Sequence, residues 1–349
     1  MQRFIVGTGR CGSTLLSSLI AEHPEVLSLS EFIGGMTSVK RFTTVDVAGD
    51  ELASILRGDQ ELSNLWVSRG FTIEETLLKH QDMAGLQPNF RASNFLHAAI
   101  PALDPHNPQA LFEEIMQWAH EQSPGPMARH LPTLFDWLTQ RLGKKLWIER
   151  TGASMEFFGE LRRTFPHAHY LHIHRDGAEA SLSMRQHAHF IQLVSFNMHA
   201  PTRAELEQAV DASLPYDADP IVRRFRNPPA LEHFGEHWTY SMVRGYREFP
   251  FVDRDHYCEI RFENLLARPY ETLEQVAEFF ELPAAGNWIE RAAAKVRSDV
   301  QRRADRLPAQ ERARLTRACF LGQILSGREG GDLPAAEASR SLLDIYARG

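Results

Sequence analysis

The chain has 349 residues, of which 43% are hydrophobic and 24% are charged, a composition typical of soluble globular proteins. Its formal net charge is −7, from 45 acidic and 38 basic residues. That balance argues against a general nucleic-acid-binding protein, because such proteins depend on neutralising phosphates. The three cysteines, Cys11, Cys258 and Cys319, match neither a disulfide framework nor a zinc-binding pattern.

The N-terminal sequence MQRFIVGTG contains no basic segment, no long apolar stretch and no cleavage signal. No part of the chain approaches the ~18 consecutive apolar residues that a membrane-spanning helix needs. Few cysteines without a pairing pattern are typical of proteins from reducing compartments. We therefore expect a cytoplasmic protein without a membrane span.

Short apolar segments alternate with helical patterns along the chain. The expected strands are Arg3–Gly7, Val26–Leu29, Leu146–Glu149, His169–His174 and His256–Arg261. The expected helices between them are Ser13–Glu22, Met155–Phe165, Ala178–His187, Glu232–Phe249 and Pro269–Phe280. Strands that alternate with helices predict an α/β fold: a three-layer αβα sandwich with a central, mostly parallel sheet.

The first strand leads into a glycine-rich loop, GTGRCGST, and then into an amphipathic helix. Glycines allow a tight turn and a close approach to a ligand, and a helix N-terminus favours an anion. The spacing of Gly7 and Gly12 fits the triphosphate-binding loop GxxxxGK[ST], but Ser13 stands where that loop has lysine. The cation is Arg10, within the loop. The sequence therefore predicts an anion-binding loop that departs from the magnesium-triphosphate type; the alternative is a glycine-rich turn with a surface arginine.

The segment from about residue 33 to residue 145 has helical patches but no convincing strand, which predicts a helical insertion between the second and third strands. The patches are Glu51–Leu56, Ile73–His80, Leu111–Glu121 and Leu131–Leu142. Aromatic residues within the insertion, either part of an acceptor pocket or part of the core, are Trp66, Phe71, Phe90, Phe95 and Trp118. Phe190–Pro229 contains five prolines and is expected to be rich in loops.

A second polar block follows the fourth strand, in HYLHIHRDGAEASLSMR. Arg175 stands at the end of the strand, where ligands of open α/β sheets bind. Ser183 lies two helical turns further on, so it can face the same ligand. The alternative is a surface Arg-Asp pair that caps a helix, with Ser183 packed or solvated.

These two blocks together resemble those of the sulfotransferases that use 3′-phosphoadenosine 5′-phosphosulfate (PAPS), in the form found in tyrosylprotein and bacterial carbohydrate sulfotransferases. The resemblance implies a P-loop-NTPase-like fold, with one domain over residues 1–328 and a tail over 329–349. It implies that the loop residues Gly9, Arg10, Cys11, Gly12, Ser13 and Thr14 bind the 5′-phosphosulfate, and that Arg175 and Ser183 hold the 3′-phosphate. The co-substrate would be PAPS, without a metal, and the acceptor a hydroxyl of a carbohydrate, lipid or phenol.

The same resemblance suggests catalytic roles. Glu31 follows Arg10 by 21 residues, the spacing of the general base in tyrosylprotein sulfotransferases, and Arg150 matches a catalytic lysine in place. Arginine is a poor acid, so Arg150 is expected to stabilise charge on the bridging oxygen together with Arg10. The alternatives are a solvated glutamate, a strand-end ion pair of Arg150 with Glu149 or Asp176, and a histidine base such as His97 or His187.

Further alternatives remain open at this stage. A P-loop kinase for a small metabolite and a catalytically inactive nucleotide-binding module both share the glycine-rich loop. The arginine-rich segment Arg291–Arg317 reads as a solvated helical face or as a lid over the 3′-phosphate. His167, His169, His172 and His174 straddle one strand, so alternation divides them between its two faces, and core or sheet-edge positions are favoured over a metal site. The sequence does not predict an oligomeric state.

Overall fold

The computed structural model describes residues 1–36, 38–58, 99–198, 222–223, 226–297 and 302–328. The chain divides into two compact units. The first comprises Met1–Gln60, Glu75–His174 and Arg247–Val300, and the second comprises Glu61–Glu74, Arg175–Tyr246 and Gln301–Gly349. Each unit is described by itself, and the single domain over residues 1–328 stays a prediction.

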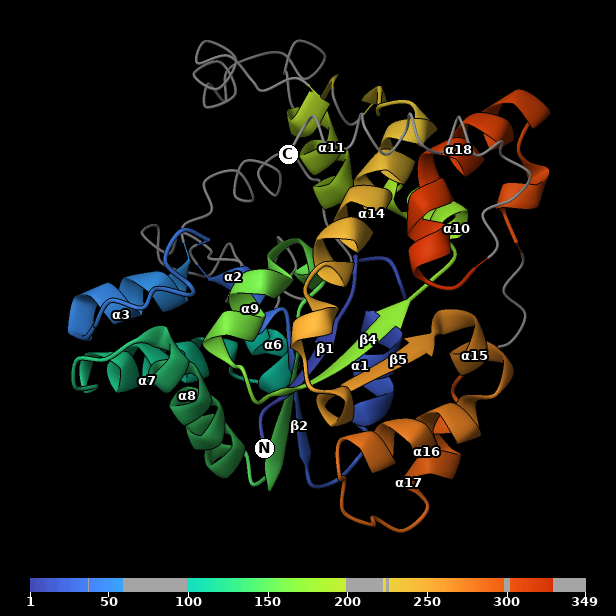
Figure 1. Cartoon of the computed structure of the whole chain (residues 1–349). Coiled ribbons are helices and arrows are strands. Elements are labelled where there is room, and N and C mark those ends of the chain that lie inside the picture. The colour runs from blue at the N-terminus through green and yellow to red at the C-terminus, as the bar shows by residue number, and fades with distance from the viewer. Residues whose placement is uncertain (37, 59–98, 199–221, 224–225, 298–301, 329–349) are drawn as a thin grey trace, which may run out of the picture. The chain divides into compact units, whose positions relative to one another are not determined.

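The first unit is built on a five-stranded sheet, in the order β2-β3-β1-β4-β5, in which all neighbouring strands are parallel (Figure 1). The strands are β1 (Arg3–Val6), β2 (Val26–Ser30), β3 (Leu146–Arg150), β4 (His169–His174) and β5 (Tyr257–Arg261). Each agrees with its predicted range to within one residue at either end. The predicted α/β fold with a parallel central sheet is therefore confirmed.

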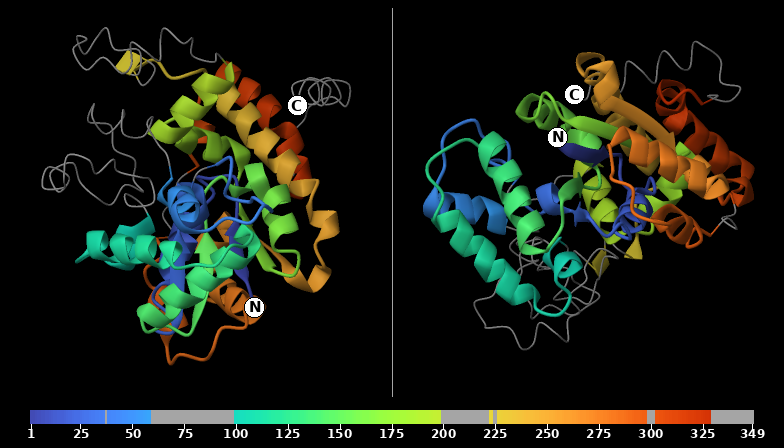
Figure 2. Two further views of the ribbon diagram at one scale, coloured as in Figure 1. Left: turned by 90° about the vertical axis from the view of Figure 1, so that its left-hand side faces the viewer. Right: turned by 90° about the horizontal axis from the view of Figure 1, so that it is seen from below.

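Helices cover both faces of this sheet because successive strand residues point to opposite sides. On one face Ile5, Leu171 and their neighbours pack in one apolar cluster with α1, α15, α16 and α17. On the other face Trp147 packs edge-on against Phe135 of α8, with ring centroids 4.9 Å apart. The view from below in Figure 2 shows these two groups of helices on opposite sides of the strands. The helices named here are α1 (Ser13–Ile20), α8 (Met127–Arg141), α15 (Phe262–Ala267), α16 (Pro269–Phe279) and α17 (Trp288–Ala293).

The described residues between β2 and β3 are mainly helical, as predicted. Before α8 they form α2 (Phe32–Gly35), α3 (Gly49–Arg57), α6 (Ile100–Leu103) and α7 (Pro108–His120). The sequence explains why α7 starts here. The side chain of the N-cap residue Asn107 accepts a hydrogen bond from Ala110 N at 3.3 Å. Pro108 has no backbone N–H, and none is needed at the first position of a helix. The predicted helix Ile73–His80 lies outside the described residues. Short segments after β3 and before β5 complete this unit: η2 (Ser154–Phe157), α9 (Phe158–Thr164), η3 (Phe249–Phe251) and η4 (Arg254–His256).

The elements in the described part of the second unit are helices: α10 (Gly177–Met184), α11 (Ala188–Met198), α14 (Leu231–Tyr246), η5 (Ala304–Arg306) and α18 (Ala309–Leu325). Trp238 of α14 is fully buried at their centre. A Cβ atom on Gly177 or Gly322 would lie 2.6 or 2.3 Å from its ring. The helices therefore approach this ring at two glycines.

The helix α11 corrects the expectation of a loop-rich segment from Phe190 onward. Phe190, Ile191 and Val194 are buried on one side of it. The five prolines that suggested loops all follow residue 200, so they do not interrupt this helix. Apolar residues at helical spacing in the first part of the segment indicate this helix, whereas the prolines that predict loops lie only in its later part.

Candidate active site

The loop between β1 and α1 is shaped by glycines with positive φ, 77° at Gly9 and 95° at Gly12. A Cβ atom on Gly12 would lie 2.0 Å from the Phe262 ring, so only glycine fits the conformation and the space. The helix α1 starts at the next residue, and its first turn carries no acidic side chain. Its N-terminal N–H groups and dipole thus meet no competing carboxylate on α1 itself, which suits an anion.

The start of the loop is fixed against η2, the short helix that follows β3. Gly7 N donates a hydrogen bond to Ser154 Oγ at 3.1 Å, and Met155 N donates to Gly7 O at 3.2 Å. The Cys11 side chain is fully buried in the apolar cluster beneath the sheet, so Cys11 can offer a ligand only its backbone. Of the three hydroxyls in the loop sequence GTGRCGST, that of Thr14 is exposed, and those of Thr8 and Ser13 are buried.

Glu31 and Arg150, the two catalytic candidates outside the loop, lie side by side at the carboxyl ends of β2 and β3. Ser30 is the register partner of Arg150 in the sheet. Arg150 Nη1 donates to Glu31 Oε1, and Nη2 donates to Ser30 Oγ. Gly152 N donates to both carboxylate oxygens of Glu31, at 3.1 and 3.2 Å. The side chain of Arg150 is 3% exposed and that of Glu31 is 20% exposed, so the carboxylate is reachable from solvent while its partner is buried.

The backbone at these strand ends is strained. Of four non-glycine residues with positive φ among the described residues, three follow the strands that meet here: Arg10 at 51°, Glu31 at 56° and Ala153 at 55°. The left-handed region costs a residue with a Cβ atom roughly 1–2 kcal/mol, and such strain clusters at functional sites. Two of the three are residues for which the sequence already suggested catalytic roles.

A buried carboxylate supports this arrangement from the opposite face of β3. Glu149 Oε1 accepts hydrogen bonds from Thr151 Oγ1 at 2.5 Å and from Ile33 N at 3.2 Å. Burial, with a smaller contribution from the negative charge of Glu31, raises the pKa of Glu149 to about 7. The sequence suggested Glu149 only as an ion-pair partner of Arg150, and it did not point to Thr151 or Ser30. The available signal was a run of polar residues directly after two buried strands.

This raised pKa predicts how stability depends on pH. Folded Glu149 keeps its proton up to about pH 7, whereas the unfolded chain releases it near the ordinary value of 4.5. The contribution of Glu149 to the free energy of unfolding therefore falls as the pH rises between these values. Between about pH 5 and pH 8 we expect the wild type to lose on the order of 2–3 kcal/mol more than Glu149→Gln, measured by urea unfolding. Parallel pH curves for the two proteins would contradict this assignment. Glu248→Gln serves as a control, because the Glu248 side chain is 21% exposed and is paired with Arg162.

The other two predicted binding residues lie in the second unit. Asp176 caps α10 by accepting a hydrogen bond from Glu179 N at 3.0 Å, and Arg175 Nη2 lies 3.5 Å from Glu179 Oε2. Ser183 is half-buried on the last turn of the same helix. The expected convergence of Arg10 and Arg175 on one ligand stays a prediction, because the two residues belong to different units.

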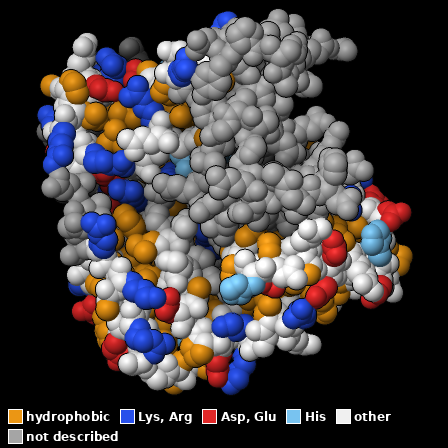
Figure 3. Space-filling view, turned by 180° about the vertical axis from the view of Figure 1, so that it is seen from behind, with side chains coloured by type: hydrophobic (Ala, Val, Ile, Leu, Met, Phe, Trp, Pro, Cys, Tyr) orange, Lys and Arg blue, Asp and Glu red, His pale blue; other side chains and the backbone are white. Residues whose placement is uncertain are grey.

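Two neighbouring residues of the arginine-rich segment, Arg303 and Ala304, contact Glu179 of α10. Arg303 Nε lies 3.4 Å from Glu179 Oε2, and Ala304 N donates to Glu179 Oε1 at 2.8 Å. Glu179 is 5% exposed, so it joins Arg175 to this segment as a buried anchor. The visible face in Figure 3 carries several blue Lys and Arg side chains close together, a local basic surface on a chain of negative net charge.

Of the three histidines in β4, His172 and His174 are buried, and His169 is partly exposed at the start of the strand. His172 is fully buried, and burial lowers its pKa to about 3. His174 Nε2 lies 3.0 Å from Glu259 Oε1, and His169 packs against His256. Of the two histidines considered as alternative bases, His97 lies outside the described residues, and His187, which is in the second unit, is buried.

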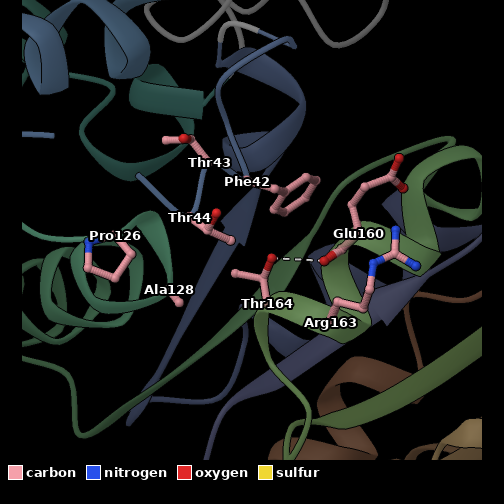
Figure 4. A pocket seen from close by; sticks show the side chains of 8 residues that line it. All are labelled: Phe42, Thr43, Thr44, Pro126, Ala128, Glu160, Arg163 and Thr164. Carbon is pink, nitrogen blue, oxygen red and sulfur yellow. Dashed lines mark hydrogen bonds between the residues drawn. The ribbon is translucent and has the colours of Figure 1, made fainter. Parts of the chain in front are cut away.

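A separate cavity of about 220 Å³ lies between the segment after α2, the start of α8 and α9 (Figure 4). Its lining residues are Phe42, Thr43, Thr44, Pro126, Ala128, Glu160, Arg163 and Thr164. Thr164 Oγ1 is occupied by a hydrogen bond to Glu160 O at 2.8 Å. None of the predicted site residues lines this cavity.

Within the part of the chain that the structure describes, no helix has the length and apolar character needed to cross a membrane. No group of three or more His, Cys, Asp or Glu side chains there is arranged to hold a metal ion.

Several solved structures are similar to the chain at low identity and with TM-scores below 0.5. The sulfotransferase domain of the olefin synthase from Synechococcus PCC 7002 is 15% identical over 99% of this chain and 93% of that chain, with a TM-score of 0.42. The sulfotransferase domain from the curacin biosynthetic pathway is 14% identical over 99% of this chain and 97% of that one, with a TM-score of 0.45. Sulfotransferase STF9 from Mycobacterium avium is 13% identical over 100% and 76%, with a TM-score of 0.40.

No curated protein matches the chain in sequence. The sequence model described as "Sulfotransferase family" matches residues 3–286. This match includes both the glycine-rich loop after β1 and the Arg-Asp-Gly block after β4, and it extends over most of the chain. The protein therefore belongs to the sulfotransferase family.

Proposed function

We propose that this protein transfers the sulfuryl group of PAPS to a hydroxyl of a carbohydrate, lipid or phenol acceptor. The observation that carries the proposal is the position of Glu31. Its carboxylate is held by Arg150 and Gly152 N at the carboxyl edge of the sheet. Strand β1, which pairs with the other side of β3 through Ile5 and Arg150, leads into the glycine-rich loop. The proposed base after β2 and the proposed anion-binding loop after β1 therefore follow the two strands that flank β3.

The donor would be held by two groups of residues. Gly9, Arg10, Cys11, Gly12, Ser13 and Thr14 would bind its 5′-phosphosulfate, and Arg175 and Ser183 its 3′-phosphate. Positive φ at two loop glycines and a first helical turn without acidic residues support the first assignment. In support of the second, β4 is the sheet neighbour of β1, and Arg175 is the residue directly after β4 in the chain.

The donor supplies the sulfuryl group, and adenosine 3′,5′-bisphosphate is its leaving group. Glu31 accepts the proton of the acceptor hydroxyl as the new oxygen–sulfur bond forms and the bond from sulfur to the bridging oxygen breaks. Arg10 and Arg150 offset the negative charge that develops on the bridging oxygen. Arg150 does so as a fixed cation, since its guanidinium keeps its proton.

Of the five aromatic residues of the insertion considered for an acceptor pocket, one lies among the described residues. Trp118 is buried and packs near Trp137, with ring centroids 6.4 Å apart, so it belongs to the core. The other four aromatics considered for an acceptor pocket lie outside the described residues. A hydroxyl acceptor is consistent with a carboxylate base, since a hydroxyl must lose a proton as it is sulfated.

Calorimetric titration and a transfer assay test the proposal together. We expect adenosine 3′,5′-bisphosphate to bind without magnesium, and radiolabelled sulfate from PAPS to reach at least one member of a panel of sugars, lipid alcohols and phenols. Binding of magnesium-ATP in place of the bisphosphate would favour a kinase and overturn the proposal. Tight bisphosphate binding without any transfer would instead indicate a non-catalytic nucleotide-binding module.

The 3′-phosphate assignment predicts a specific loss of affinity. Arg175→Ala should weaken the binding of adenosine 3′,5′-bisphosphate by roughly 10- to 100-fold, because a charge-assisted hydrogen bond to phosphate is lost. Arg185→Ala is the matched control: Arg185 follows the same helix and lies 3.6 Å from Glu311, as Arg175 lies 3.5 Å from Glu179. Equal affinities for the two variants would remove Arg175 from the binding site.

A further inference from the structure

Helix α2 begins directly after the proposed base, and Glu31 is its N-cap residue. A polar N-cap side chain usually turns back to accept a hydrogen bond from the second or third N–H of the helix, which here belong to Ile33 and Gly34. Within the described structure the Glu31 side chain makes no such capping bond. Its carboxylate is directed instead to Arg150 and Gly152 N.

The capping bonds come from the neighbouring strand and the residue after it. Ile33 N donates to Glu149 Oε1 at 3.2 Å, and Gly34 N donates to Thr151 Oγ1 at 3.1 Å. The Thr151 hydroxyl in turn donates to Glu149 Oε1 at 2.5 Å. A Cβ atom on Gly34 would lie 2.8 Å from Thr151 Cγ2, so the close contact between the helix and Thr151 depends on glycine at this position.

Glu149 and Thr151 are each 2% exposed, so water cannot readily replace either one as an acceptor. The helix N–H groups that they satisfy would then lose a buried partner, which is costly. Glu149 interacts electrostatically with three charged groups, those of Glu31, Arg150 and Arg41. The Arg41 guanidinium lies 3.9 Å from the centre of the Phe157 ring. The turn is thus held by a buried polar network.

We propose that Glu149 and Thr151 are positioning residues for the transfer reaction: they cap α2 from β3 and its following loop, so that the Glu31 carboxylate is available to the acceptor hydroxyl. This inference rests on the proposed function of Glu31. Without the two caps, Glu31 would relax from its left-handed conformation and its side chain would turn back to the helix N-terminus. The base would then be misplaced while the glycine-rich loop stays intact.

The test compares Thr151→Val with Thr151→Ser and with Thr139→Val. Valine keeps the shape of threonine without the hydroxyl, serine keeps the hydroxyl, and Thr139 is an equally buried control whose hydroxyl donates to Phe135 O at 2.6 Å within α8. The readouts are hydrogen exchange at the amides of Ile33 and Gly34, affinity for adenosine 3′,5′-bisphosphate, and kcat and KM with labelled PAPS.

We expect Thr151→Val to speed exchange at these two amides by roughly tenfold or more and to lower kcat by roughly 10- to 100-fold. Bisphosphate affinity should stay at the wild-type value, and Thr151→Ser should restore most of kcat. Unchanged kcat in a folded Thr151→Val protein, or an equal loss in Thr139→Val, would overturn the inference. If the proposed function is wrong, the wild-type protein will transfer sulfate to no acceptor. The capping role can still be tested in that case, because unchanged exchange at the Ile33 and Gly34 amides of Thr151→Val would reject it.

Discussion

Replacing Glu31 by glutamine should abolish sulfuryl transfer while leaving donor binding intact. Glutamine has nearly the same shape and can still accept hydrogen bonds from Arg150 and Gly152 N, but it cannot take a proton from the acceptor. We expect kcat to fall by about 10²- to 10⁴-fold, the usual contribution of a general base. Affinity for adenosine 3′,5′-bisphosphate, measured by calorimetry, should change by less than about threefold, since Glu31 is not assigned to the donor.

A matched control exists for this variant. Glu248 is 21% exposed and paired with Arg162 at 3.0 Å, much as Glu31 is 20% exposed and paired with Arg150. Glu248→Gln should therefore keep wild-type kcat. If Glu31→Gln retains turnover at the level of this control, another group is the base, and the assignment of Glu31 is wrong.

Replacing Arg150 by methionine should damage both catalysis and stability. Methionine has a similar length, but it leaves the Glu31 carboxylate without its buried cation. It also removes the positive charge that is proposed to stabilise the bridging oxygen. We expect kcat to fall by about 10²- to 10³-fold. The free energy of unfolding should fall by about 3–5 kcal/mol, because one partner of a buried ion pair is lost. Single-turnover kinetics and urea unfolding measure the two effects.

Two further variants separate charge from geometry at this position. Arg150→Lys keeps a cation but cannot reach both Glu31 and Ser30 as the guanidinium does, so it should recover only part of kcat. Arg162→Met removes a comparable arginine that pairs with Glu248 and is 19% exposed, and it should leave kcat unchanged. Wild-type turnover in Arg150→Met would exclude electrostatic stabilisation by Arg150.

The sheet and its flanking helices could be predicted from the sequence because their signals are local. Each strand is a short apolar run next to glycine or a helix signal, and β4 was predicted with both of its ends correct. The helix α11 was missed because prolines later in the same segment dominated its composition. The order of the strands could not be read from these patterns, since it depends on long-range packing.

The candidate site was predictable only in part. The spacing of its glycines predicts the anion-binding loop, and the resemblance to known sulfotransferases points to Glu31 and Arg150. That the two side chains bond to each other follows from the register of β2 with β3, which pairs Ser30 with Arg150. The roles of Glu149 and Thr151 could not be foreseen, because they depend on how the turn after β2 crosses the end of β3.

The glycine of the Arg-Asp-Gly block is a requirement of the helical core in the second unit. Gly177 opens α10, and its Cα lies so close to the Trp238 ring that any side chain would collide with it. The first turn of α10 therefore packs against Trp238 of α14. This turn follows Arg175 and is capped by Asp176. Changes to this tryptophan, or to Gly322, which also meets its ring, would shift the helix that carries Ser183 and follows Arg175, the two residues proposed to bind the 3′-phosphate.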